Sequence, residues 1–62
     1  MCLSNVYQIQ GEEQTLVCEY VSDIRVDGEN VILTDVIGKE LTVVGTLMQV
    51  DLINNRVLIR SA

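Results

Sequence analysis

Short aliphatic segments, separated by glycines and polar dipeptides, recur along the whole 62-residue chain. Valine, isoleucine and leucine dominate these segments, two tyrosines are the only aromatic residues, and proline is absent. β-Branched residues favour strands, and short segments of this kind at even spacing are typical of an all-β protein. The helical stripe with a period of 3.6 residues is missing. The pattern therefore predicts an all-β domain and argues against a helical one.

The glycines and polar pairs divide the chain into six or seven expected strands. These strands cover residues 3–10, 14–20, 23–26, 30–36, 40–44, 47–53 and 56–60. The expected turns lie at Gly11-Glu12-Glu13, Asp27-Gly28, Gly38-Lys39 and Asn54-Asn55, with a type I′ hairpin at Asp27-Gly28. Gly45 stands at a junction between strands, and residues 45–52 are the least regular segment, with one helical turn as the alternative.

A single small sheet has to bury its apolar face, either by closing into a barrel or by packing against a second copy. We therefore expect residues 1–62 to form one small SH3-like or OB-like β-barrel, or a meander of six to seven short strands. Several strands carry apolar residues on both faces, as Val31, Ile32 and Leu33 illustrate. One barrel interior cannot hold them all, and a 62-residue domain is marginal by itself. We therefore also expect a homodimer.

The charge balance excludes several classes of partner. Nine acidic and four basic residues give a formal net charge of -5, and the pI is about 4.2. Nucleic-acid binding needs a lysine and arginine surface, so we expect no nucleic-acid partner. No apolar run approaches the ~20 residues that cross a bilayer, and the N-terminal residues lack the pattern of a signal peptide. We expect a cytoplasmic protein without a membrane partner, in which the cysteines stay reduced.

The residue types also argue against catalysis. The chain has no histidine, which excludes the Ser-His and Cys-His arrangements, and its four glycines stand apart rather than forming a phosphate loop. The neighbouring carboxylates Glu12 and Glu13 are expected in a solvated turn. Asp27, Glu29 and Asp35 do not have the spacing of a calcium loop. We expect no enzyme, no catalytic residue and no residue that binds an organic cofactor.

The two cysteines are expected to play different parts. Cys18 alternates with Leu16 and Tyr20 within an expected strand, and free cysteine is among the most buried residue types, so we assign it to the core. Cys2 lies beside the chain terminus, where the α-amine has a pKa far below that of lysine. With Met1 retained, its amine, the Cys2 amide nitrogen and the Cys2 sulfur close two fused chelate rings. With Met1 removed, the Cys2 amine and thiolate close one ring.

Either form of the N-terminus offers nitrogen and thiolate donors in one plane. Square-planar Ni(II) or Cu(II) accepts this set, whereas zinc prefers four tetrahedral ligands. One chain supplies two or three donors, and two chains about a two-fold axis supply four. Cys2 and Met1 are therefore the candidate metal ligands, with one metal expected per dimer.

At these residues the sequence resembles the CooT family of small nickel-binding proteins. The resemblance rests on the opening Met1-Cys2-Leu3, on the central hairpin around residues 31–35 and on Val50-Asp51-Leu52 before the last strand. It implies a dimeric accessory protein that binds Ni(II) through Cys2 and serves the maturation of carbon monoxide dehydrogenase. The client enzyme could also be a different nickel enzyme, because members of the family occur apart from that dehydrogenase.

Two alternatives remain open at this point. The hydrogenase maturation chaperone HypC also begins Met-Cys-Leu and forms a small β-barrel, but its chains usually continue with a proline-containing segment that is absent here. The second alternative is an adaptor module without a metal, in which an exposed strand edge pairs with a partner.

Overall fold

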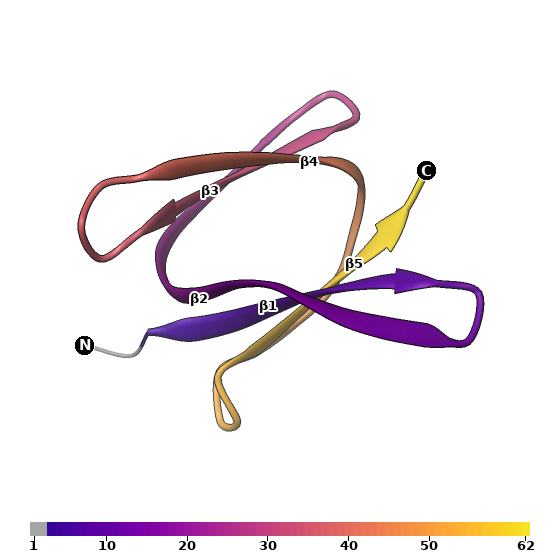
Figure 1. The fold of residues 1–62 in the computed structure, drawn as a ribbon, viewed down its shortest axis with the longest axis horizontal. Coiled ribbons are helices and arrows are strands. Elements are labelled where there is room, and N and C mark those ends of the chain that lie inside the picture. Colours follow the sequence, from indigo (N-terminus) through magenta and orange to yellow (C-terminus); the bar gives the residue numbers. More distant parts are fainter. Residues whose placement is uncertain (1–2) are drawn as a thin grey trace.

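Five β-strands follow one another in meander order in the computed structural model, which describes residues 3–62. They are β1 (Ser4–Gln10), β2 (Glu13–Asp27), β3 (Asn30–Asp35), β4 (Glu40–Asp51) and β5 (Arg56–Ser61). Each strand pairs antiparallel with the next, and a parallel pairing of β1 with β5 closes the barrel (Figure 1). The closing pair is parallel because an odd number of alternating strands leaves the first and last pointing the same way.

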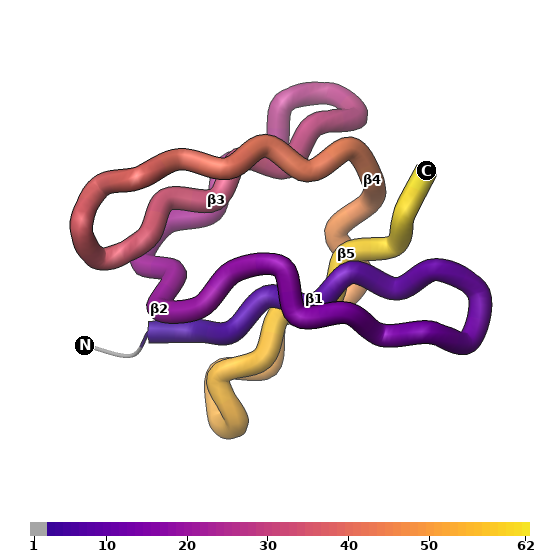
Figure 2. The backbone as a smooth tube through the Cα atoms, in the orientation of Figure 1, coloured from indigo at the N-terminus to yellow at the C-terminus, as the bar shows by residue number. Residues whose placement is uncertain are grey.

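The expected all-β barrel is confirmed, whereas the expected number of strands is wrong. Residues 14–20 and 23–26 belong to one strand, β2, and Gly45 lies inside β4 rather than between two strands. Residues 45–51 are extended, so the helical alternative for this segment is wrong as well. Both long strands curve around the barrel, as the tube in Figure 2 shows, and each pairs with a different neighbour along its two halves.

The bend in β2 lies at Tyr20, whose φ of 57° falls in the left-handed region. Register shifts interrupt the ladders on both sides of it, between Ser4 and Val6 in β1 and between Val21 and Asp23 within β2. A bulge of this kind turns a strand without ending it. The polar residues after Tyr20 therefore do not mark a break between strands.

The bend in β4 lies at Gly45, which packs against the neighbouring strand. A Cβ atom at this position would overlap the carbonyl oxygen of Arg60 in β5. A glycine inside a strand commonly marks such a close approach of two backbones. The glycine therefore bends the strand rather than terminating it.

The turns lie where the sequence predicts them, with one difference in type. Between β2 and β3 the two central residues are Gly28 and Glu29, because Asp27 pairs with Asn30. Gly28 has a φ of 60°, and Glu29 is not among the residues with positive φ. Positive φ at the first central residue alone is the type II′ pattern, so the expected type I′ turn is wrong. The β4–β5 turn uses Asn55 with a φ of 55°, as the asparagine pair predicts.

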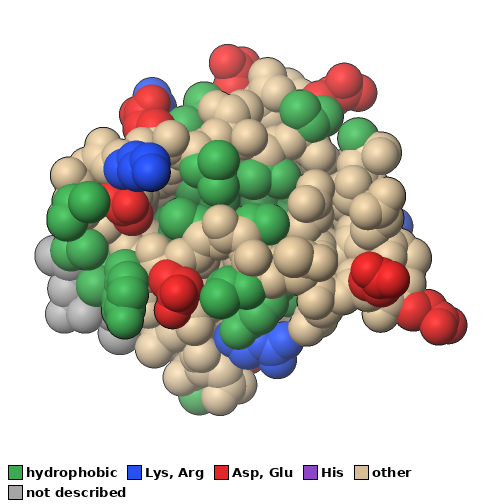
Figure 3. Space-filling model, in the orientation of Figure 1, with side chains coloured by type: hydrophobic (Ala, Val, Ile, Leu, Met, Phe, Trp, Pro, Cys, Tyr) green, Lys and Arg blue, Asp and Glu red, His purple; other side chains and the backbone are tan. Residues whose placement is uncertain are grey.

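The core consists of seven buried apolar side chains that come from all five strands. They are Val6, Val21, Val31, Leu33, Val43, Val57 and Ile59. Burying one such side chain stabilises the fold by about 1.5–3 kcal/mol. The interior is too small for the remaining apolar residues, and hydrophobic side chains gather at the centre of the face shown in Figure 3. Residues 3–62 contain no helix that is long and apolar enough to span a membrane.

Candidate metal segment and the groove beside it

The candidate ligands Met1 and Cys2 lie outside the described residues. The strand that follows them begins at Ser4, which is buried and pairs with Val21 of β2. The chain therefore enters the barrel directly beside the bend at Tyr20.

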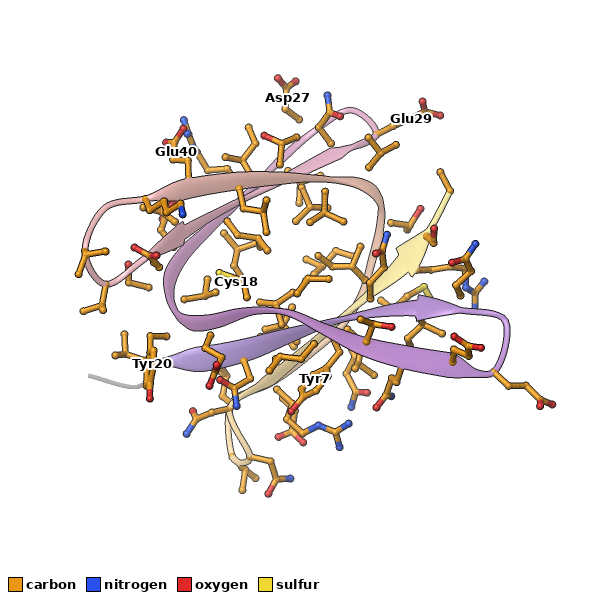
Figure 4. All side chains as sticks on the ribbon, in the orientation of Figure 1. Tyr7, Cys18, Tyr20, Asp27, Glu29 and Glu40 are labelled. Carbon is orange, nitrogen blue, oxygen red and sulfur yellow. The ribbon has the colours of Figure 1, made fainter. Side chains whose placement is uncertain are left out.

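The second cysteine, Cys18, is half-buried in β2 and packs against the core. Its Sγ lies 3.7 Å from the carbonyl oxygen of Glu19, to which the thiol donates. Burial raises the pKa of the Cys18 thiol, and the Asp35 carboxylate raises it further, while Lys39 opposes this change. The thiolate is the form that binds metals, so this thiol is a poor ligand at neutral pH. The assignment of Cys18 to core packing is confirmed (Figure 4).

The expected alternation around Cys18 is only partly correct. Val6 pairs with Cys18 and Tyr7 with Leu16, so Val17 is an extra residue in β2 at this point. The bulge turns both Val17 and Cys18 toward the core. Leu16 and Tyr20 are exposed instead of sharing a buried face with Cys18.

The acidic residues weighed as a calcium site, Asp27, Glu29 and Asp35, do not form a metal-binding group in the structure. Asp27 and Glu29 point outward at the β2–β3 hairpin in Figure 4. The Asp35 carboxylate accepts hydrogen bonds from the amides of Ile37 (3.0 Å) and Lys39 (2.9 Å), so it stabilises its own turn. Within residues 3–62, no group of three histidine, cysteine or acidic side chains is placed to bind a metal. The described part of the barrel therefore adds no metal cluster to the candidate donors Met1 and Cys2.

A groove of about 370 Å³ opens beside the start of β1, and the sequence did not predict it. Its walls are Ser4 of β1, residues between 21 and 26 of β2, and Leu47, Val50, Leu52 and Val57 of the β4–β5 hairpin. The groove exists because β1 begins at Ser4, whereas β2 continues for several residues past the pairing partner of Ser4. No local pattern could reveal it, because it depends on the relative lengths of two strands.

Comparison with known proteins places this fold in a family. A family model described as CO dehydrogenase accessory protein CooT matches residues 1–60. The chain belongs to the CooT family. The resemblance found in the sequence is therefore confirmed, and the protein is a member of a family of CO dehydrogenase accessory proteins.

A solved structure agrees with this CooT assignment at the level of the fold. The crystal structure of a provisionally assigned CooT from Carboxydothermus hydrogenoformans matches with a TM-score of 0.89 over 98% of each chain. The two sequences are 18% identical, so this likeness concerns the barrel and not the chemistry of a site. No curated protein matches the chain.

Proposed function

We propose that this CooT protein is a nickel-binding accessory protein without enzymatic activity, which binds Ni(II) through Cys2 and Met1 at a dimer interface. The observation that carries the proposal is the packing of the other thiol. Cys18 packs against the core, and burial and the Asp35 carboxylate raise the pKa of its thiol, so Cys2 is the better placed cysteine for a thiolate ligand. Nickel is the cargo in this function, and a nickel enzyme such as carbon monoxide dehydrogenase is the proposed client.

The chemistry of the N-terminal donors supports nickel. An amine or amide nitrogen and a thiolate separated by a two-carbon bridge close five-membered chelate rings in one plane. This arrangement suits square-planar Ni(II) or Cu(II) better than Zn(II). Ligation needs the reduced cysteine, so we place the protein in the cytoplasm, where thiols stay reduced.

The surface near the start of β1 supports a second copy. Cys2 is two residues from Ser4 in the sequence, so a metal shared by two Cys2 residues requires the two barrels to face each other at this end. Tyr20, Val36 and Ile37 are exposed apolar residues close to it, and the Val36 amide hydrogen-bonds the Tyr20 carbonyl. Figure 4 shows Tyr20 beside the start of β1. A second copy that covers these side chains would remove exposed apolar surface and would also bring the two N-termini together.

Calorimetric titration with Ni(II) under reducing conditions tests the proposal. Cys2→Ala is expected to abolish binding and leave the circular dichroism spectrum unchanged. Cys18→Ala is the matched control, with the expected loss of stability but unchanged nickel stoichiometry of one metal per two chains. Unaltered nickel affinity in Cys2→Ala would refute the proposed site, and one metal per chain would refute the shared site.

The pH dependence provides a second test of thiolate ligation. Each thiolate ligand displaces one proton, and the shared metal has a Cys2 thiolate from each chain, so the apparent affinity should fall by at least about tenfold per pH unit below the apparent pKa of the thiol. A nickel affinity that does not change with pH would argue against Cys2 as the ligand.

A further inference from the structure

The groove beside β1 contains a strand edge that the described part of the chain leaves open. Ser4 pairs with Val21 at the start of β1, and beyond this point residues 23–26 of β2 pair only with β3. On the other side of these residues lies the groove, with the β4–β5 hairpin as its far wall. The groove therefore separates this part of β2 from the β4–β5 hairpin.

The register indicates which main-chain groups face the groove. Asp27 and Asn30 flank a two-residue turn and therefore form a hydrogen-bonded pair. Hydrogen-bonded and non-hydrogen-bonded pairs alternate along an antiparallel ladder. The N–H and C=O groups of Ile24 and Val26 therefore point away from β3 and toward the groove. Such groups can hydrogen-bond an added strand.

The side chains in the groove lie on the inner face of the barrel, yet they are open to solvent. Val26 pairs with the fully buried Val31 but is 58% exposed. Val50 pairs with the buried Val57 but is 46% exposed. Both would be core residues if another strand covered them. An occupant therefore needs apolar side chains at alternate positions.

The charges around the groove favour a basic binding partner. Among residues 3–62, Asp23 is the one charged residue that lines it, and Asp27 and Asp51 flank the lining residues Val26 and Val50. No basic residue of the described chain lines it. The Arg25 guanidinium is 3.2 Å from Glu40 and only reaches Asp23 at 4.0 Å, which leaves the Asp23 carboxylate weakly compensated. An occupant with lysine or arginine complements this surface.

A second copy fits less well as the occupant. It carries the same carboxylates, so pairing this edge with its own copy would bring Asp23, Asp27 and Asp51 of both chains together.

We propose that the groove is a docking site for an extended segment of a partner protein. The segment adds as a strand to residues 22–26 of β2, inserts alternate apolar side chains against Val26 and Val50, and places a lysine or arginine near Asp23. This binding mode is strand addition, in which main-chain hydrogen bonds give affinity and the side-chain pockets give selectivity. It does not depend on nickel, although the groove begins at Ser4, two residues from Cys2.

The direct test uses a six-residue peptide of alternating valine and lysine, acetylated and amidated at its ends. In a titration of the 15N-labelled protein, amide shifts should change at residues 22–26 and at Val50 and Leu52. The amides of Ile24 and Val26 should exchange more slowly with solvent. A matched peptide with glutamate in place of lysine should bind more weakly. N-methylation of the central valine in the lysine peptide should abolish the binding of that peptide. Absence of these shifts, or equal binding of the three peptides, overturns the proposal.

Two variants separate docking from general charge attraction. Asp23→Asn should weaken the lysine peptide roughly two- to five-fold, as expected for a partly exposed ion pair. Glu12→Gln makes the same change of charge at the far end of β1 and should leave the affinity unchanged. An equal loss of affinity in both variants overturns the proposal. Sedimentation gives a second outcome against it: if the protein is a dimer and Val26→Asp converts it to a monomer, a second copy covers the groove. The Cys2→Ala variant should still bind the peptide. Peptide binding therefore tests the groove independently of the proposed nickel site.

Discussion

The main-chain N–H of Val36 donates a 2.9 Å hydrogen bond to the carbonyl oxygen of Tyr20 and ties the β3–β4 turn to the bend of β2. Tyr20 occupies this position with a φ of 57°, which costs roughly 1–2 kcal/mol for a residue with a Cβ atom. Tyr20 is 59% exposed, so packing compensates little of this cost. The hydrogen bond and the ladders on both sides of the bend hold the strained residue in place.

We expect Tyr20→Gly to be more stable than Tyr20→Ala by about 1 kcal/mol. Glycine adopts positive φ without a penalty, whereas in an ordinary strand alanine is the more stable residue by about 0.5–1 kcal/mol. Urea unfolding of the two variants measures the difference. The usual order, with alanine the more stable, would show that the bend is not strained.

A second pair of variants distinguishes close approach from backbone strain. Gly45→Ala should destabilise the barrel by more than ~2 kcal/mol, because the new Cβ meets the Arg60 carbonyl and forces β4 and β5 apart. Gly28→Ala should cost only about 1–2 kcal/mol, because Gly28 has positive φ but open space around it. Thermal or urea unfolding compares the two. Equal losses would argue against the tight contact between β4 and β5.

The Cys18 thiol should react slowly with iodoacetamide in the folded Cys2→Ala variant. Its pKa is raised by burial and by Asp35, so less thiolate is present at pH 8 than in the unfolded chain. The linked contribution to stability is present below the unfolded pKa and is lost as the pH rises above it, because only the unfolded thiol then ionises. Alkylation rates with and without urea test this. Equal rates in both states would contradict the burial of Cys18.

The lowered pKa of the Asp51 carboxyl group should depend on Asn54. The Asn54 side chain and amide, followed by the Ile53 amide, donate hydrogen bonds to Asp51 and lower the pKa of its carboxyl group. Asn54→Ala should raise this pKa toward its usual value in an NMR titration of the carboxyl carbon. A lowered folded pKa contributes stability that is present above the unfolded pKa and is lost as the pH falls through the folded pKa. Asp51→Asn should therefore flatten the acid side of the stability profile.

Most of the local structure could be predicted from the sequence. The turns at Gly11, Gly28, Gly38 and Asn55 lie where small or polar residues tolerate positive φ, and all four have it. The number of strands could not be predicted, because a bend at Tyr20 looks like a break between strands until its neighbours are known. The alternation in β2 failed for the same reason, since the extra residue Val17 shifts the phase of the strand.

The candidate metal site was identified from Met1 and Cys2 in the sequence, and the structure contributes the surroundings of their entry into the barrel. It adds the packing of Cys18 against the core, which raises the pKa of this thiol, and the surface around Tyr20. The groove was not predictable at all, because its lining comes from β1, β2 and the β4–β5 hairpin, which are distant in sequence.

The sequence by itself determined the strand composition, the turns and the family, because these depend on residue type and on spacing along the chain. Only the tertiary structure decided that β2 and β4 run unbroken through their bends and that β1 and β5 close the barrel in parallel. It also decided that Val26 and Val50 stay open to solvent on the inner face. Each of these features depends on which backbones meet across the barrel, and β1 is too short to cover the full length of β2.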